Sequence, residues 1–146
     1  MDQDPIAARI STSFASQPAM TLIGARLEKV AKGSVEIHLP FAPAITQQHG
    51  FLHAGILATA LDSACGYAAL TTMALDAGVM TVEFKVNLLS PGAGDWFRLL
   101  GRVRKSGRTI VFSEGEAFAV GPEGEKLIAT MTATMMSIRN RGNIRN

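Results

Sequence analysis

The chain has 146 residues, of which 47% are hydrophobic, and a formal net charge of +2 at pH 7. This length predicts one domain over residues 1–146 that can bury a core, and the hydrophobic share argues against extended disorder. The small charge gives no indication of a nucleic-acid partner. The one cysteine, Cys65, excludes an internal disulfide, as is typical of a reducing compartment, so we expect a cytoplasmic protein.

The N-terminus and one long apolar stretch bear on membrane association. The first residues contain no apolar run, so they do not form a signal peptide. Residues 51–75 are long enough to cross a bilayer. However, Asp62 near their centre would cost roughly 2.5–3.5 kcal/mol on insertion scales. We therefore expect a buried helix here and no membrane partner.

The N-terminal part of the chain is expected to form one helix and two strands. Asp4 and Pro5 are typical of an N-cap and a first-turn proline, and apolar residues then recur every four positions. This pattern predicts an amphipathic helix within residues 1–18. Residues 22–30 and 34–41 are predicted to be strands, the second because its apolar and polar residues alternate.

A long helix is predicted from Ala54 to about Leu75, after a loop over residues 41–50. Nearly every face of it is apolar or small, which is typical of a helix enclosed by other structure. The tail over residues 139–146 is polar and basic and is expected to be loose. Alternation and turn residues predict four further strands that follow one another as a meander, at residues 81–89, 95–104, 109–120 and 126–138.

This order of elements predicts an α+β fold in which one long helix packs against one antiparallel sheet of five to six strands. Asp62 is then the feature that needs an explanation. It is the one charged residue between Phe41 and Leu75, and an unpaired carboxylate in an apolar helix is costly. A backbone amide or an arginine could satisfy it, but we favour a functional carboxylate with a shifted pKa.

The spacing between Gly55 and Asp62 has a consequence for any site that uses both. Seven residues place them on nearly the same helix face, separated by an axial rise of roughly 10 Å. A base and an oxyanion donor must each lie about 3 Å from one reacting group. Two antiparallel copies of the helix would satisfy both distances. If both groups act, the site is therefore expected between two subunits.

The start of the long helix provides the second candidate group. The backbone N–H groups of Ala54 and Gly55 lie at the positive end of the helix dipole and can polarise a carbonyl oxygen. His53 and Gln47 could orient a substrate, although His53 could equally be an N-terminal cap. Thr81, at a strand start, could hold a water or be a surface residue.

Other reactive residue types give weaker indications. Cys65 has no neighbouring base, and a carboxylate three positions away would raise its pKa, so we expect a core residue. His38 and His49 are expected to be structural. The three histidines and one cysteine show no metal-ligand spacing, and the surroundings of Gly107 match no phosphate-binding loop.

The segment QQHGFLHAGILATALD over residues 47–62 resembles the N-x-x-G-x-x-H-G-G…D motif of the PaaI-type (phenylacetic-acid-degradation) hotdog thioesterases. Residues 81–91 and the turn at residues 104–108 also look like their counterparts, so the resemblance covers residues 19–138. Two positions depart from the motif. Gln47 replaces an asparagine and Ala54 replaces a glycine.

The resemblance implies the hotdog fold and an enzyme that hydrolyses acyl-CoA to the free acid and CoA, without a metal or further cofactor. It implies homodimers with joined sheets, often paired into homotetramers. In this resemblance Asp62 would be the nucleophile or general base, and the amides of Gly55 and Ala54 would be the oxyanion donors. Gln47 would position the carbonyl or the water. His53 would support the helix start, and Thr81 would lie near the water.

The basic turn would bind the CoA part of the substrate. The resemblance implies that its residues meet the CoA phosphates, which accounts for the local basic cluster. These residues are Arg104, Lys105, Ser106, Gly107 and Arg108. We expect medium-chain or aromatic acyl-CoA as substrate. The alternatives are an acyl-thioester dehydratase or hydratase using His53 with Asp62, and a non-catalytic acyl-CoA-binding protein.

Overall fold

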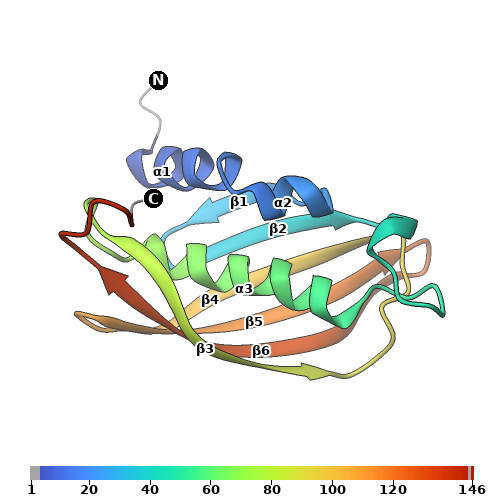
Figure 1. Ribbon diagram of the computed structural model, residues 1–146. Helices are drawn as coiled ribbons and strands as arrows, with labels where there is room; N and C mark the ends of the chain where they lie inside the picture. The colour runs from blue at the N-terminus through green and yellow to red at the C-terminus, as the bar shows by residue number, and fades with distance from the viewer. Residues whose placement is uncertain (1–3, 145) are drawn as a thin grey trace.

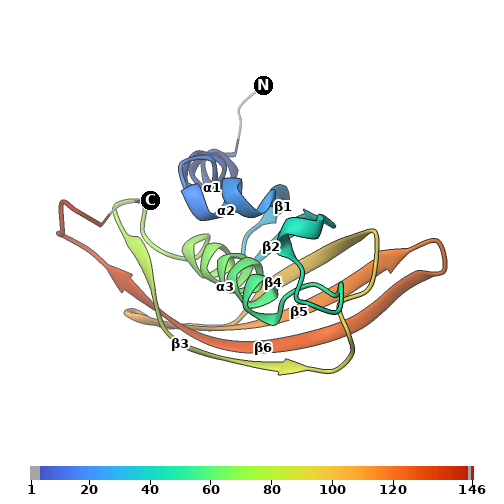
Figure 2. The ribbon, with the colours of Figure 1, turned by 45° about the vertical axis from the view of Figure 1, so that its right-hand side comes forward.

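The computed structural model describes residues 4–144 and 146, and it shows one long helix packed against a six-stranded antiparallel sheet (Figure 1). The long helix, α3 (Ala54–Leu70), lies in the concave side of the curved sheet, with α1 (Pro5–Ala15) and α2 (Pro18–Ile23) beside it (Figure 2). The predicted α+β hotdog architecture is therefore confirmed. The strands are β1 (Arg26–Ala31), β2 (Ser34–Pro40), β3 (Gly78–Leu88), β4 (Trp96–Ser106), β5 (Ile110–Gly121) and β6 (Gly124–Ile138).

The strand order is β1-β2-β4-β5-β6-β3, which differs from the predicted meander. Short hairpins join β4 to β5 and β5 to β6 as expected, but β3 pairs with β6, with Thr81 opposite Met135 and Leu88 opposite Ala129. Residues 89–95 cross from the edge of the sheet to its interior instead of turning back. The meander was wrong for β3 because a crossing connection and a hairpin carry the same turn residues. As a result, β3 is an edge strand.

Two paired glycines allow α3 to approach the sheet closely. Gly101 on β4 lies opposite Gly115 on β5. A Cβ atom on Gly101 would lie 2.3 Å from the carbonyl oxygen of Ala64, and one on Gly115 would lie 2.9 Å from the Sγ of Cys65. Any side chain at these positions would push the helix away from the sheet. This contact turns the Ala64 face of α3 towards β4 and leaves Asp62 facing β3.

The region before β1 contains a helix where the sequence predicted a strand. Pro18 opens α2 in its first turn, and Gly24, with a left-handed φ of 78°, ends it. The strand predicted at residues 22–30 therefore begins only at Arg26. The prediction failed because six residues are too few to display a helical period.

The long helix ends at Leu70 and not near Leu75, which is 72% exposed. The hydroxyls of Thr71 and Thr72 donate hydrogen bonds of 2.6 and 2.8 Å to carbonyl oxygens three residues earlier, which compete with continued helix. Arg9 of α1 also helps to end the helix by binding carbonyl groups there. Its guanidinium donates to carbonyl oxygens at and beyond the helix end, those of Leu70, Met73, Ala74 and Ala77.

The C-terminal segment returns to the start of β3. Arg139 pairs with Asp76 at 3.1 Å, and the Asn146 side chain accepts a 2.8 Å hydrogen bond from the Val79 N–H. Arg145, part of the tail expected to be loose, lies outside the described residues. Among the described residues, no helix is long and apolar enough to cross a membrane.

Candidate active site

The N-terminus of α3 is capped by the side chain of the residue that precedes it. The Nδ1 atom of His53 accepts a 2.9 Å hydrogen bond from the Gly55 N–H. Because an accepting nitrogen is unprotonated, the ring proton lies on Nε2. The Gly55 amide predicted to bind an oxyanion is thus occupied by a side chain. The Ala54 N–H, by contrast, has no hydrogen-bond acceptor in the described part of the chain.

Gln47 lies beside this helix end with its amide orientation fixed. Its Oε1 atom accepts hydrogen bonds from the backbone N–H groups of His49 (2.6 Å) and Phe51 (3.2 Å). Only the oxygen can accept two N–H bonds, so the Nε2 group is left as a donor. Gln47 and Ala54 both line a cavity of about 410 Å³, whose other walls are mainly apolar side chains around Leu57 and Leu88.

Asp62 lies in the middle of α3, where β3 supplies its partner. The Thr81 hydroxyl donates a 2.9 Å hydrogen bond to the Asp62 carboxylate. Burial raises the pKa of Asp62, and the Thr81 hydrogen bond partly offsets that rise. Asp62 and Thr81 line a second, smaller cavity of about 80 Å³. A carboxylate that is harder to ionise than usual, beside a cavity, is typical of a general base or nucleophile.

The chain thus carries two groups of candidate residues at two places. Gln47, His53, Ala54 and Gly55 lie together at the start of α3, while Asp62 and Thr81 lie about 10 Å further along the helix. The two cavities share no lining residue. One cavity is therefore lined by the predicted oxyanion donor Ala54, and the other by the predicted base or nucleophile Asp62.

The basic turn lies at the other end of α3. The Ser106 hydroxyl donates a 3.0 Å hydrogen bond to Thr72, just after the helix end, and the Gly107 N–H bonds to the Ile110 carbonyl at 2.8 Å. Lys105 and Arg108 are exposed. Since α3 has 17 residues, this turn and the Ala54 end are separated by about 25 Å along the helix.

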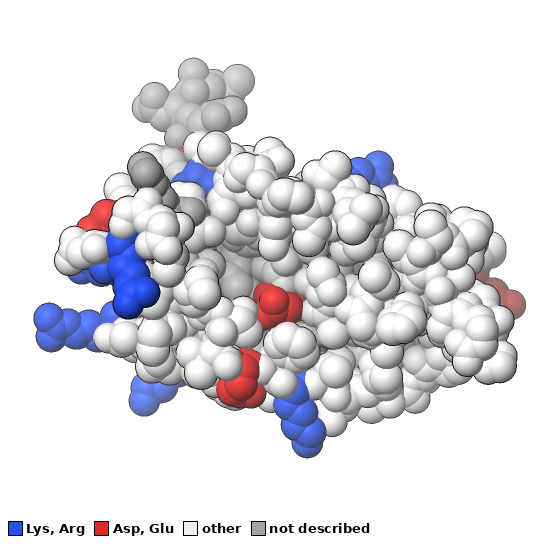
Figure 3. All heavy atoms as spheres, viewed as in Figure 1, with Lys and Arg blue, Asp and Glu red and all other residues white. Residues whose placement is uncertain are grey.

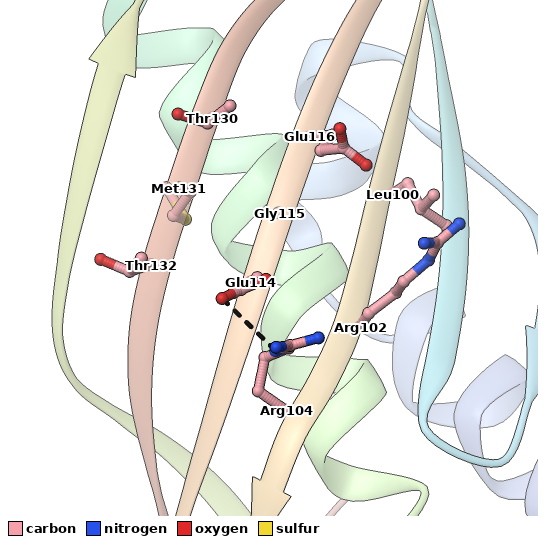
Figure 4. Close-up of a pocket in the computed structure, with 9 residues that line it drawn as sticks. All are labelled: Leu100, Arg102, Arg104, Glu114, Gly115, Glu116, Thr130, Met131 and Thr132. Carbon is pink, nitrogen blue, oxygen red and sulfur yellow. Dashed lines mark ion pairs between the residues drawn. The ribbon is translucent and has the colours of Figure 1, made fainter.

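The outer face of the sheet carries a separate hollow of about 330 Å³, drawn in Figure 4. Its polar lining includes Arg102, Arg104 and Glu114, and Arg104 pairs with Glu114 at 3.5 Å. The hollow lies over β4, β5 and β6, on the side of the sheet away from α3 (Figure 4). It is therefore not continuous with the cavities beside Asp62 and Ala54.

The side chains of Cys65 and His38 are held in the fold and lie outside the two candidate groups. Burial and the nearby charges of Asp62 and Glu114 raise the pKa of the Cys65 thiol to about 12, which keeps it protonated at neutral pH. His38 lies 2.6 Å from Glu36 and packs on Trp96. In the described residues, no group of three or more His, Cys, Asp or Glu side chains could hold a metal ion.

The sequence did not draw attention to Tyr67, Ser63 and Gln17. Ser63 and Tyr67 line the cavity beside Asp62, and both lie 3.4 Å from the Gln17 side chain of the preceding segment. The available signal was helical spacing. Asp62 and Gly66 are four residues apart, as are Ser63 and Tyr67, so the two pairs form adjacent rows along the same side of α3.

Comparison with known proteins identifies the family. The sequence model of one protein family, the thioesterase superfamily, matches residues 49–125, which include the α3 residues described above. The chain belongs to the thioesterase superfamily. It is a thioester hydrolase, and this agrees with a carboxylate and a helix N-terminus placed beside cavities. The dehydratase and the binding-protein alternatives are correspondingly disfavoured.

Solved structures agree with this assignment. The thioesterase is 49% identical to a thioesterase family protein from Silicibacter pomeroyi, with a TM-score of 0.91 over 92% of this chain and 99% of that one. The PaaI protein from the phenylacetic acid degradation operon of E. coli shares its fold at 18% identity, with a TM-score of 0.81 over 91% and 93% of the two chains. BH2602 from Bacillus halodurans, solved with CoA, is 20% identical with a TM-score of 0.77, over 93% of each chain. The predicted resemblance to PaaI-type hotdog thioesterases is confirmed.

Proposed function

We propose that this thioesterase hydrolyses medium-chain or aromatic acyl-CoA, and that it does so as a homodimer whose sites combine residues of two chains. The observation that carries the proposal is the separation between Asp62, with its raised pKa, and the Ala54 N–H, which has no acceptor in the described part of the chain and lies about 12 Å away along the same helix. Neither group alone provides both a base and an oxyanion donor.

Asp62 supplies the base or the nucleophile. As a general base, its carboxylate takes a proton from water while the water oxygen bonds to the thioester carbon. As a nucleophile, its oxygen bonds to that carbon and water then cleaves the anhydride. In both routes the C–S bond breaks and CoA leaves as a thiolate that takes up a proton. The Thr81 hydroxyl, 2.9 Å from Asp62, orients the carboxylate and lies near the water.

The α3 N-terminus of the partner supplies the oxyanion donors. The Ala54 N–H and the Gln47 Nε2 group line one cavity and have no acceptor among residues 4–144 and 146. Donors held in advance at the developing negative charge are worth several kcal/mol in catalysis. The Gly55 N–H can join them when the His53 ring moves, since Nδ1 now occupies it.

The edge strand β3 is the surface that we assign to the dimer contact. An unpaired strand edge favours pairing with a second strand, and β3 exposes apolar side chains along its length. These are Met80 (48% exposed), Val82 (55%), Phe84 (43%) and Leu88 (55%), and Leu89 (54%) follows directly after the strand. The molecular face in Figure 3 carries few charged side chains, which favours burial against a second copy. Antiparallel pairing of two α3 helices would also bring the partner's basic turn towards the Ala54 end.

Subunit complementation tests the shared site. Asp62→Asn removes the base. Ala54→Pro removes the free N–H at a position where proline suits a helix start, and His53 before it has a proline-compatible φ of −64° and ψ of 132°. Each variant alone should be nearly inactive. Refolding the two together should restore up to about half of the activity per hybrid dimer, because one of its two sites is intact.

The mixed dimers distinguish a site shared between two chains from a site within one chain. If both groups came from one chain, each hybrid site would carry one defect and mixing would restore nothing. The control is a mixture of Asp62→Asn with itself, refolded in the same way. Hydrolysis is followed by release of free CoA from phenylacetyl-CoA and straight-chain acyl-CoA. No release from any thioester by the wild-type protein would contradict the proposed activity.

A further inference from the structure

The cavity beside Asp62 extends along one face of α3. Ser63, Gly66 and Tyr67 follow Asp62 at spacings of one, four and five residues, and all line the cavity. Gly66 has no side chain, so the helix surface one turn beyond the carboxylate is hollow. A Cβ atom at Gly66 would approach nothing closer than the end of the Met135 side chain, at 3.9 Å.

Tyr67 closes this hollow and is held there by α1. Its ring packs on Phe14 with the centroids 6.0 Å apart, and its hydroxyl lies 3.2 Å from the Ser13 hydroxyl and 3.4 Å from the Gln17 side chain. Only 6% of Tyr67 is exposed. The ring cannot swing aside without breaking contacts to the last turn of α1 and to Gln17 in the segment after it.

Asn146 contacts the same cavity from the side of β3. The Asn146 side chain donates a 3.0 Å hydrogen bond to Ser13 and accepts a 2.8 Å bond from the Val79 N–H at the start of β3. Asn146 also lines the cavity. Asn146 therefore forms part of the cavity wall, while Ser13 of α1 holds both Asn146 and Tyr67 in place from behind.

We infer that this hollow receives the acyl group and that Tyr67, held by α1, is the stop that limits acyl length. The inference rests on the proposed function, which places the thioester carbonyl at Asp62. From Asp62 to Tyr67 the helix rises about 7.5 Å, a length that a hexanoyl or phenylacetyl group spans. Longer acyl groups would meet the Tyr67 ring. Tyr67 is thus a specificity-determining residue, with Ser13 and Gln17 as its positioning residues.

Two substitutions should move the length limit in opposite directions. Gly66→Ala adds a methyl group to the hollow without a steric conflict in the fold. It should lower kcat/KM for hexanoyl-CoA about tenfold while butyryl-CoA stays within about twofold. Tyr67→Leu removes the ring and should raise kcat/KM for decanoyl-CoA relative to hexanoyl-CoA by about tenfold. The measurement is kcat/KM over straight-chain acyl-CoA from acetyl to decanoyl.

Gly121→Ala is the matched control, because a Cβ atom there meets nothing within 4 Å and the residue is the last one of β5, away from α3 and β3. Its length profile should equal that of the wild type. If Tyr67→Leu does not fold, Gly66→Ala decides alone. An active Gly66→Ala enzyme with the wild-type length profile would overturn this inference while leaving the proposed function intact. A wild-type protein that hydrolyses no member of the series would overturn both.

Discussion

The Thr81 hydroxyl lies 2.9 Å from the Asp62 carboxylate and donates a hydrogen bond to it across the gap between β3 and α3. Two opposing effects act on this carboxylate. Burial disfavours its charged form and raises its pKa, and the hydrogen bond from Thr81 favours the charged form and lowers the pKa, with burial the larger effect. The sequence indicated both residues separately, and the fold makes them a pair.

The pH dependence of activity should follow this pair. Asp62 must be ionised to act as base or nucleophile, so kcat/KM should fall on the acid side at a pH above about 3.9, the ordinary value for an aspartate. Thr81→Val removes the hydrogen bond that lowers the pKa, so the acid limb should move to higher pH. The measurement is kcat/KM of both proteins across the acid and neutral range. A limb that stays in place in Thr81→Val would contradict the pairing.

Replacing Asp62 should lower the activity of the enzyme but raise its stability at neutral pH. A carboxyl whose pKa is raised by folding contributes its stability when protonated, below the ordinary pKa, and loses it as pH rises through the folded-state value. Asp62→Asn should therefore nearly abolish hydrolysis and raise the melting temperature at pH 7. The gain should shrink as pH falls towards about 4.

Asp76 provides a control of opposite sign for that experiment. Its hydrogen bond to Arg139 lowers its pKa, so any contribution is present above the ordinary pKa and is lost on acidification. Asp76→Asn should thus not raise the melting temperature at pH 7. Equal shifts in the two variants would show that burial of the Asp62 charge is not the cause.

Much of the site could be predicted from local sequence because its signals are local. The start of α3 at Ala54 follows from the change from loop to apolar helix, and Asp62 is conspicuous as the one charge in that stretch. The assignment of the edge strand could not be predicted. Residues 89–95 contain the same turn-forming residues as a hairpin, and the pairing of β3 with β6 is decided by packing across the whole sheet.

The ends of elements were missed where distant residues decide them. The carbonyl groups at the end of α3 are satisfied in part by Arg9, 61 residues before Leu70, so the sequence around Leu75 continues to look helical. Likewise, Tyr67 acquires its position from Ser13 and Gln17, which precede it by about 50 residues. Such contacts have no periodic pattern in the sequence.

The glycine pair between β4 and β5 should be essential for stability. In Gly101→Ala the new Cβ atom would lie 2.3 Å from the Ala64 carbonyl oxygen, and backbone atoms on both sides cannot move independently. We expect a loss of about 3 kcal/mol in the free energy of unfolding, measured by urea denaturation. Gly121→Ala, with no neighbour within 4 Å, should change it by less than about 0.5 kcal/mol.

The basic turn should contribute to binding of CoA and not to the chemical step. Lys105 and Arg108 are exposed, so salt should screen their attraction to the CoA phosphates. The double variant Lys105→Ala, Arg108→Ala should raise KM for acyl-CoA several-fold at low salt, by an amount that shrinks at high salt, with kcat unchanged. The same acyl group on N-acetylcysteamine, which lacks phosphates, should show no change in KM. A change with both substrates would contradict phosphate binding.

Substitutions at His53 should show whether this residue only caps the α3 N-terminus or also takes part in the reaction. His53→Ala removes the acceptor for the Gly55 N–H and should lower the free energy of unfolding by about 1 kcal/mol, as loss of an N-cap does. His53→Asn replaces the acceptor with another good N-cap residue and should restore that stability. If His53 acts by supporting the helix start, His53→Asn should also restore most of kcat. Restored stability without restored kcat would instead show that the imidazole ring, through its Nε2–H, takes part in the reaction itself.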